Sequence, residues 1–271
     1  MRHTVTRRRA AQGRRPLILV VPALCALAFL LVPLVGLLLR APWRDLPARL
    51  FNAEVGQALR LSLLCASLAT MICLVLGVPL AWLLARGEVP GRGVLRALVT
   101  VPLVLPPVVG GVALLFVLGR RGLIGQYLYE WFGVSLPFTT AGVVVAEAFV
   151  AMPFLVISVE GALRAADPRF EDAAATLGAS RWLTFRRVTL PSVLPGVVAG
   201  GVLCWARALG EFGATITFAG NFPGKTTTMP LAVYLALETD PQDAIVLSLV
   251  LLTVSVVVLV ALRERWIRST V

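Results

Sequence analysis

The sequence predicts an all-α integral membrane protein with six transmembrane helices. Its 271 residues are 58% hydrophobic and only 14% charged, with a mean hydropathy of +0.89, whereas a soluble domain carries about 25% charged residues. The apolar residues also lie in runs long enough to cross a hydrocarbon core, which takes roughly 20 residues. The charged residues gather between these runs, as is typical of a chain that crosses the bilayer several times.

The expected spans lie near residues 16–39, 57–84, 97–118, 137–163, 191–217 and 244–262. The first run follows a tail, residues 1–15, that carries six arginines, so a cleaved signal peptide is its rival interpretation. With about 24 residues and no clear A-x-A cleavage site after it, the run is better explained as a retained helix. Residues 1–54 would then comprise a basic tail, a first helix and an external connection.

The basic residues predict the orientation of these spans. With the N-terminus inside the cell, the cytoplasmic segments hold 17 of the 25 basic residues, the external segments hold seven, and Arg207 lies within a span. Cytoplasmic loops carry an excess of Lys and Arg, so we expect both termini in the cytoplasm and a multi-pass protein of the plasma (inner) membrane. This topology explains the net charge of +11 better than nucleic-acid binding does, because no basic face is interleaved with aromatic residues.

The third expected span has an irregular composition. It contains the prolines and glycines of residues 101–111, which are Pro102, Pro106, Pro107, Gly110 and Gly111. These residues cannot form a straight regular helix. Irregular backbone at membrane depth is tolerated where it is buried in protein or lines an aqueous cavity. A kinked packing helix and a pathway lining are both open interpretations.

The chain lacks the residues of the common catalytic and metal sites. Its four cysteines all lie inside apolar runs without a CxxC pair, and the only histidine is His3. Metal coordination and Ser–His–Asp or Cys–His catalysis therefore lack their parts. We expect no catalytic residue and no metal site, which makes a membrane-embedded enzyme a remote alternative.

The longest polar run after the N-terminus, residues 167–191, lies between the fourth and fifth spans. Asp167 is a plausible helix N-cap followed by Pro168 at the first helical position. Gly178 falls where a helix end favours a left-handed residue, and Ser180 can cap a second short helix. The first helix carries an apolar stripe, formed by Phe170, Ala173, Ala174 and Leu177. The run predicts an amphipathic knob that is either a docking site for a soluble protein or an ordinary surface loop.

The spacing within this run resembles the EAA signature of bacterial ABC importer permeases. Asp172-Ala173-Ala174 is followed after three residues by Gly178 and, nine residues later, by Val188-Thr189-Leu190-Pro191, with Asp in place of the usual Glu and Val in place of the usual Ile. In that family this loop, here residues 167–187, is a coupling helix that sits in a cleft of a cytoplasmic ATPase. The resemblance implies a docking set of Phe170, Glu171, Asp172, Ala173, Ala174, Leu177, Gly178 and Pro191.

Three further segments resemble molybdate permeases of the same superfamily. They are LVLPPVVGG followed by GRRGLIG, the external WFG, and RALGEFGATITFAGNFPGKTTTMPLAVYLALE. The resemblance implies a type I ABC importer permease (MetI-like) domain over residues 55–265 and import of molybdate by alternating access. Sulfate and thiosulfate permeases share a related EFGA segment, so sulfate, thiosulfate and tungstate remain alternative cargoes.

The same resemblance implies the partners. Two copies of the chain would form one pore, two cytoplasmic ABC ATPases would dock on it, and an extracytoplasmic binding protein would deliver molybdate. No cofactor is expected on this chain, and ATP with Mg²⁺ would be bound by the ATPase. The string AGNFPGKT, residues 219–226, has Ala219 where a P-loop has its first glycine, and it follows an expected membrane helix rather than a strand.

Charges at membrane depth are costly and usually face a partner or an aqueous path. Arg207 and Glu211 are spaced i, i+4 and can pair on one face. A mutual salt bridge or interhelical tie is one interpretation of the pair, and a place on the pathway or gate is the other; Glu147 has the same two interpretations. Hydroxyls and close backbone approach suit an oxyanion, so the candidate pathway set is Arg207, Gly210, Glu211, Gly213, Thr215, Thr217, Pro106, Pro107 and Glu147.

Overall fold

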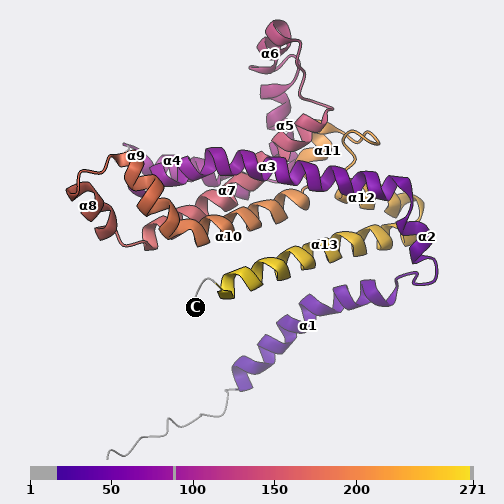
Figure 1. The fold of residues 1–271 in the computed structure, drawn as a ribbon. Coiled ribbons are helices and arrows are strands. Elements are labelled where there is room, and N and C mark those ends of the chain that lie inside the picture. Colours follow the sequence, from indigo (N-terminus) through magenta and orange to yellow (C-terminus); the bar gives the residue numbers. More distant parts are fainter. Residues whose placement is uncertain (1–16, 88–89, 269–271) are drawn as a thin grey trace, which may run out of the picture.

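The computed structural model describes residues 17–87 and 90–268, and this part of the chain consists of helices joined by turns (Figure 1). The basic tail expected at residues 1–15 lies outside the described residues. The elements are α1 (Leu17–Leu39), α2 (Leu46–Leu50), α3 (Ala53–Arg86), α4 (Arg92–Val104), α5 (Pro107–Leu118), α6 (Gly125–Phe132), α7 (Thr140–Ala165), α8 (Arg169–Thr176), α9 (Arg181–Thr184), the π-helical turn η1 (Phe185–Thr189), α10 (Leu190–Leu209), α11 (Gly213–Ala219), α12 (Met229–Thr239) and α13 (Pro241–Arg268). The predicted all-α membrane fold is confirmed.

The core lies where α3, α7 and α10 pack together. On α3 the contact face is made of small residues, among them Cys65, Ala66 and Ala69, all fully buried. Small side chains let membrane helices approach closely, because packing replaces the hydrophobic effect in lipid. The helix in the middle is α7, since 67% of its most apolar window is buried.

Two helices lie at the edge of this core. α13 packs against α12, and α1 lies beyond α13, apart from the other helices (Figure 1). The apolar window of α1 has none of its residues buried within the described chain, and its mean hydropathy is 2.9. Such a surface requires lipid or another protein around it.

The third expected span, residues 97–118, is not one helix. α4 and α5 meet at a bend of 115°, so the described chain has five single helices that can cross a membrane and a sixth span only if this bent pair counts as one. The bend falls at Leu105, whose backbone is extended (φ −66°, ψ 133°). A residue before proline avoids the helical conformation, and Pro106 and Pro107 follow directly. The expectation of an irregular segment is confirmed, although its geometry is a sharp turn and not a kink.

The fifth expected span, residues 191–217, is also divided. α10 ends at Leu209, and a short break precedes α11, so residues 213–217 belong to a separate helix. At its other end the span is longer than predicted, because α9, η1 and α10 run on as one apolar segment from Arg181 to Leu209. The π-helical turn lies just before Pro191, which has no N–H to donate to the carbonyl four residues earlier.

Three short helices lie in segments that were expected to be loops, namely α2, α6 and α12. Each contains too few residues to cross a bilayer, so a search for apolar runs of about 20 residues passes over them. The remaining span boundaries move by a few residues: the second span is observed as 53–86, the fourth as 140–165 and the sixth as 241–268.

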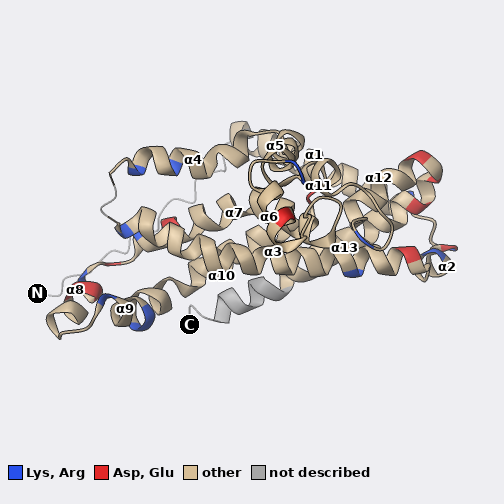
Figure 2. Cartoon of the chain, turned by 90° about the horizontal axis from the view of Figure 1, so that it is seen from above, with Lys and Arg blue, Asp and Glu red and all other residues tan. Residues whose placement is uncertain are grey.

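The two ends of the bundle differ in charge. Lys and Arg gather on α4, α8 and α9 at one end, which we call the α8 end (Figure 2). At the opposite end, near α2 and α12, Asp and Glu residues are prominent in the same view. The α8 end is the end that the distribution of basic residues assigns to the cytoplasm.

Candidate functional site

The predicted amphipathic knob consists of two separately capped helices. Asp167 accepts a hydrogen bond from the backbone N–H of Arg169 at 2.9 Å. α8 begins at Arg169, one residue later than predicted, with Pro168 at the N-cap position. Gly178 has a φ of +83°, the left-handed conformation expected at the end of the helix. Ser180 accepts from the N–H of Leu183 at 3.3 Å and so starts α9. These local contacts give α8 a defined shape without help from a partner.

The apolar stripe of α8 is left uncovered by the rest of the described chain. Phe170 is 66% exposed and Leu177 is 88% exposed, while Ala173 is exposed and Ala174 is half-buried. A lone exposed apolar residue is ordinary, but a helix that turns most of its apolar stripe outward marks an interaction surface. We call Phe170, Ala173, Ala174 and Leu177 the α8 stripe.

The acidic residues of the docking set lie on the other side of α8. Glu171 pairs with Arg86 of α3 at 3.3 Å, and both Glu171 and Asp172 line a cavity of about 480 Å³ between α8 and α3. Pro191 lies apart from this surface, in the first turn of α10. The structure therefore separates the predicted set into an outward apolar stripe, an inward acidic side and a helix start.

A polar junction joins α10 to α11. The expected pair is present: Nη2 of Arg207 lies 2.6 Å from Oε2 of Glu211, whose side chain is 1% exposed. The other oxygen of Glu211 accepts the N–H of Ala214 at 2.7 Å, which places a carboxylate at the first turn of α11. Gly210 lies in the break between the two helices. Glu211 thus connects the two pieces of the divided span.

Glu147 lies on α7, which packs against α11. Its side chain is 1% exposed, and its Oε2 has no hydrogen-bond partner among the described residues. The hydroxyl of Thr215 is equally buried and equally without a partner in the described chain. The structure thus shows no tie formed by Oε2 of Glu147, and a pathway role for either residue stays a prediction.

α5 and α11 approach each other unusually closely. A Cβ on Gly111 would lie 1.7 Å from Oγ1 of Thr217, 2.8 Å from the carbonyl oxygen of Ala214 and 3.0 Å from its Cα. A Cβ on Gly213 would lie 3.0 Å from Cβ of Pro107. The hydroxyl of Thr217 donates to the carbonyl of Gly213 at 2.8 Å. The bent third span and the divided fifth span therefore form one packed layer.

Several polar contacts at the site were not predicted from the sequence. At the α8 end, Glu160 of α7 receives Arg164 at 3.0 Å and also pairs with Arg96 of α4, and Arg86 reaches α8 as described above. Glu160 lies inside the fourth expected span, and an acidic residue at that depth is a sequence signal for a basic partner. Arg96 and Arg86 are 64 and 85 residues away from their partners, so no local spacing rule finds these two pairs. Glu160 and Arg164 are spaced i, i+4, and this pair was within reach of such a rule.

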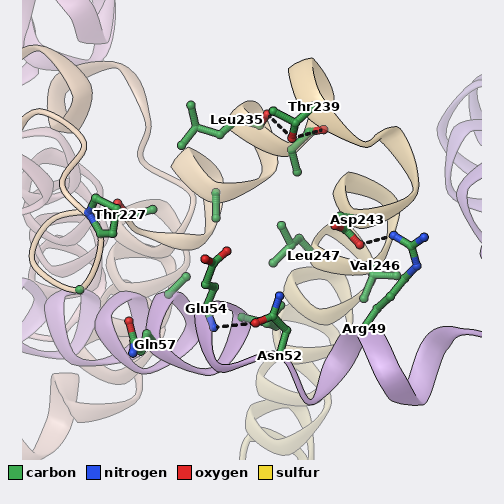
Figure 3. A pocket seen from close by; sticks show the side chains of 16 residues that line it. Arg49, Asn52, Glu54, Gln57, Thr227, Leu235, Thr239, Asp243, Val246 and Leu247 are labelled. Atoms are coloured by element: carbon green, nitrogen blue, oxygen red, sulfur yellow. Dashed lines mark hydrogen bonds and ion pairs between the residues drawn. The ribbon is translucent and has the colours of Figure 1, made fainter.

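The opposite end of the bundle holds a pocket of about 220 Å³ between α2, α3, α12 and α13 (Figure 3). Arg49 of α2 crosses its rim to Asp243 and, at 2.8 Å, to Asp240. Asn52 caps α3 by accepting the N–H of Glu54 at 3.3 Å. The pocket thus borders on the connection between α2 and α3, the connection between α12 and α13, and the loop that precedes α12.

The sequence of this chain is similar to those of membrane subunits of transport systems. Residues 77–269 match the family of binding-protein-dependent transport system inner membrane components. The molybdenum transport system permease ModB of Mycobacterium tuberculosis is 50% identical over 246 residues, covering 90% of this chain and 92% of the relative. ModB of Escherichia coli is 44% identical over 211 residues, with 78% and 92% covered. The sulfate transport system permease CysT of Escherichia coli is 37% identical over 234 residues, with 85% and 84% covered.

Solved structures share the fold. A bacterial ABC transporter involved in the import of the acidic polysaccharide alginate has a TM-score of 0.73 at 19% identity, covering 93% of this chain and 94% of that one. The MetNI methionine ABC transporter has a TM-score of 0.62 at 18% identity, with 80% and 96% covered. These likenesses confirm the predicted type I importer fold.

The relatives are transport permeases, and within residues 17–87 and 90–268 five helices are long and apolar enough to span a bilayer, with the bent pair as a further candidate. The chain is accordingly a multi-pass inner-membrane transport subunit and not an enzyme. It belongs to the family of binding-protein-dependent transport system inner membrane components and, within that family, to the ModB-type permeases.

Proposed function

We propose that this chain is the transmembrane subunit of an ATP-driven importer that carries molybdate into the cell by alternating access. One observation carries the proposal: α8 is a separately capped helix at the basic end of the bundle, and it turns its apolar stripe away from its own chain. A cytoplasmic ABC ATPase is the partner that such a helix fits in this family. The chain itself makes and breaks no bonds, and ATP with Mg²⁺ is bound by the ATPase.

The mechanism follows from the link between α8 and the spans. When two ATPases close on ATP, they move α8, and the rigid helices attached to it move with it. The divided spans are the parts that can change their relative angle, because α4 and α5 meet at 115° and α10 and α11 meet at a break. Hydrolysis resets the arrangement.

A second copy of the chain is required to enclose a pore. On the bent pair α4–α5, apolar side chains face outward, with Val104 86% exposed and Phe116 73% exposed. Exposed side chains of this kind are suited to packing against another helix or lipid. In the homodimer we propose, the layer of α5 and α11 lies beside the pathway. Arg207, 26% exposed beside the buried Glu211, is the positive charge that an entering oxyanion would meet.

The cargo is proposed from kinship. The ModB relatives share 44–50% identity with this chain, whereas the sulfate permease CysT shares 37%. An extracytoplasmic protein would deliver the anion to the opposite end of the bundle. Tungstate, sulfate and thiosulfate are the alternatives, and the anion held by the cognate binding protein separates them. Tight sulfate binding without molybdate binding would overturn the proposed cargo.

Docking is tested by placing a charge on the α8 stripe. Leu177→Asp is expected to abolish co-purification with the ATPase while leaving membrane insertion intact, because Leu177 is 88% exposed and contributes little to the fold of its own chain. Ala174→Asp should act in the same way. Gly178→Asp is a less specific variant, because a side chain at φ +83° strains the backbone as well.

The matched control is Val94→Asp, which puts the same charge at an exposed position of α4 at the same end of the bundle (66% exposed). The control variant should retain the ATPase. Normal co-purification and uptake by Leu177→Asp would refute docking through this surface.

A further inference from the structure

The contact between α8 and the membrane helices is polar and incomplete. None of the eight residues of α8, all of which the structure describes, is buried. Between α8 and α3 lies the cavity of about 480 Å³, with Trp82 of α3 and Phe185 of η1 in its lining. A helix that borders on a cavity can shift without pushing its neighbour, because motion is transmitted through packed atoms. α8 also packs on η1, whose Phe185 meets Trp82 of α3 edge-on with ring centroids 6.2 Å apart, so it is the direct link between α8 and α3 that has to cross this gap.

One side chain crosses it. Nε of Arg86 donates to Oε1 of Glu171 at 3.3 Å, and Nη2 of the same guanidinium donates to the carbonyl oxygen of Ala166 at 3.2 Å. Arg86 is the last residue of α3, Ala166 is the C-cap that follows α7, and Glu171 lies in the first turn of α8. A single planar group therefore joins three helix ends, a task for which the fork of donors on arginine is suited.

The partial burial of this ion pair makes it stronger than an ion pair on an open surface. The side chains of Arg86 and Glu171 are 20% and 23% exposed. A partly shielded pair is screened less by salt than an open one. The nearby pair of Arg96 with Glu160 joins different helices, because it connects α4 to α7 and does not involve α8.

We infer that Arg86 is a positioning residue for the coupling helix: its pair with Glu171 makes α3 and α7 follow α8 when the ATPase moves that helix. The inference rests on the proposed function, because it assumes an ATPase docked on α8. α3 and α7 form the core of the bundle, so this link carries the movement to the helices around the pathway. Without it, α8 shifts partly into the cavity, and fewer anions are transported for each ATP hydrolysed.

The test uses the complete transporter, permease with ATPase and binding protein, in proteoliposomes. Molybdate accumulation and ATP hydrolysis are measured together, and their ratio is compared for the wild type, Arg86→Ala, Glu171→Ala and the double variant. We expect each single variant to lower the ratio of anions transported per ATP by about fivefold, the lower range of measured coupling between sites. The double variant should be no worse than either single variant, because both remove the same link.

Two further variants separate positioning from folding. Arg86→Lys retains a charged donor and should preserve most of the ratio, and Glu171→Gln retains the size and hydrogen-bonding capacity of the side chain and should lose less of the ratio than Glu171→Ala. Arg96→Ala removes a comparable arginine from the same end and should leave the ratio unchanged. The Arg86 and Arg96 variants should co-purify with the ATPase in wild-type amounts, since neither residue belongs to the docking set and the α8 stripe is intact.

The outcomes are distinct. An unchanged ratio in Arg86→Ala, additive losses in the double variant, or an equal loss in Arg96→Ala would overturn the inference. Failure of the wild-type transporter to accumulate molybdate would instead overturn the proposed cargo. In that case the same variants are compared by the stimulation of ATP hydrolysis by the loaded binding protein. Stimulation that is weaker in Arg86→Ala but unchanged in Arg96→Ala would still support the link, and equal stimulation in both would overturn it.

Discussion

The close approach of α5 and α11 predicts that Gly111→Ala destabilises the protein. In an ordinary helix this change stabilises by about 0.5–1 kcal/mol, because alanine loses less conformational freedom than glycine. Here the new Cβ would lie 2.8 Å and 3.0 Å from backbone atoms of Ala214, which cannot rotate away. Overpacking of this kind costs about 1–3 kcal/mol. The backbone contacts therefore decide the sign, and a net loss of stability is expected.

The matched control is Gly161→Ala on α7, where the new Cβ would meet nothing within 4 Å. The helix gain is common to both variants, so their difference in stability should equal the overpacking cost of about 1–3 kcal/mol. At roughly 2–4 °C per kcal/mol this corresponds to about 2–12 °C in Tm, measured by thermal unfolding of the purified protein in detergent. Equal Tm values for the two variants would refute the packing of α5 against α11.

Two further predictions concern ion pairs. Arg207→Ala leaves the buried Glu211 without its partner and should cost about 3–5 kcal/mol in unfolding free energy, whereas the double variant Arg207→Gln/Glu211→Gln should cost less; an equal cost would contradict a buried pair. The hydrogen bond from Arg49 lowers the pKa of Asp240 from its ordinary value of 3.8, so the pair stabilises above pH 3.8 and loses this contribution as the pH falls through the lower pKa of the folded protein. The Tm of the wild type should therefore exceed that of Asp240→Asn at pH 7 and converge with it in strong acid, and a gap that is independent of pH would disprove the linkage.

The sequence was informative where local rules apply. Apolar runs of bilayer length predicted the membrane helices, because a spanning helix needs a fixed number of residues. The caps at Gly178 and Ser180 were predicted because each depends only on one residue and the backbone a few residues away. Asp167 bonds the backbone of Arg169, but the N-cap position of α8 is occupied by Pro168 and not by Asp167 as predicted. For the same reason the i, i+4 pair of Arg207 and Glu211 was expected before the structure showed it.

Long-range geometry was beyond these rules. Prolines at 106 and 107 predicted an interruption, but the angle of 115° depends on how α5 packs against α11. The break after Leu209 has no proline beside it, because the prolines of this apolar run, Pro191 and Pro195, lie at its other end, so the hydropathy around the break matched that of one continuous helix. The contact between Arg86 and Glu171 joins residues 85 positions apart, and only the folded chain brings them together.

The central claim is that α8 connects this membrane subunit to an ATPase that drives molybdate uptake. The most direct measurement is ATP-dependent accumulation of molybdate in proteoliposomes containing the complete transporter, for the wild type and for Leu177→Asp in parallel. We expect accumulation against a gradient by the wild type and none by the variant, with both chains inserted equally. Accumulation by Leu177→Asp at the wild-type rate would show that α8 does not connect the permease to the ATPase.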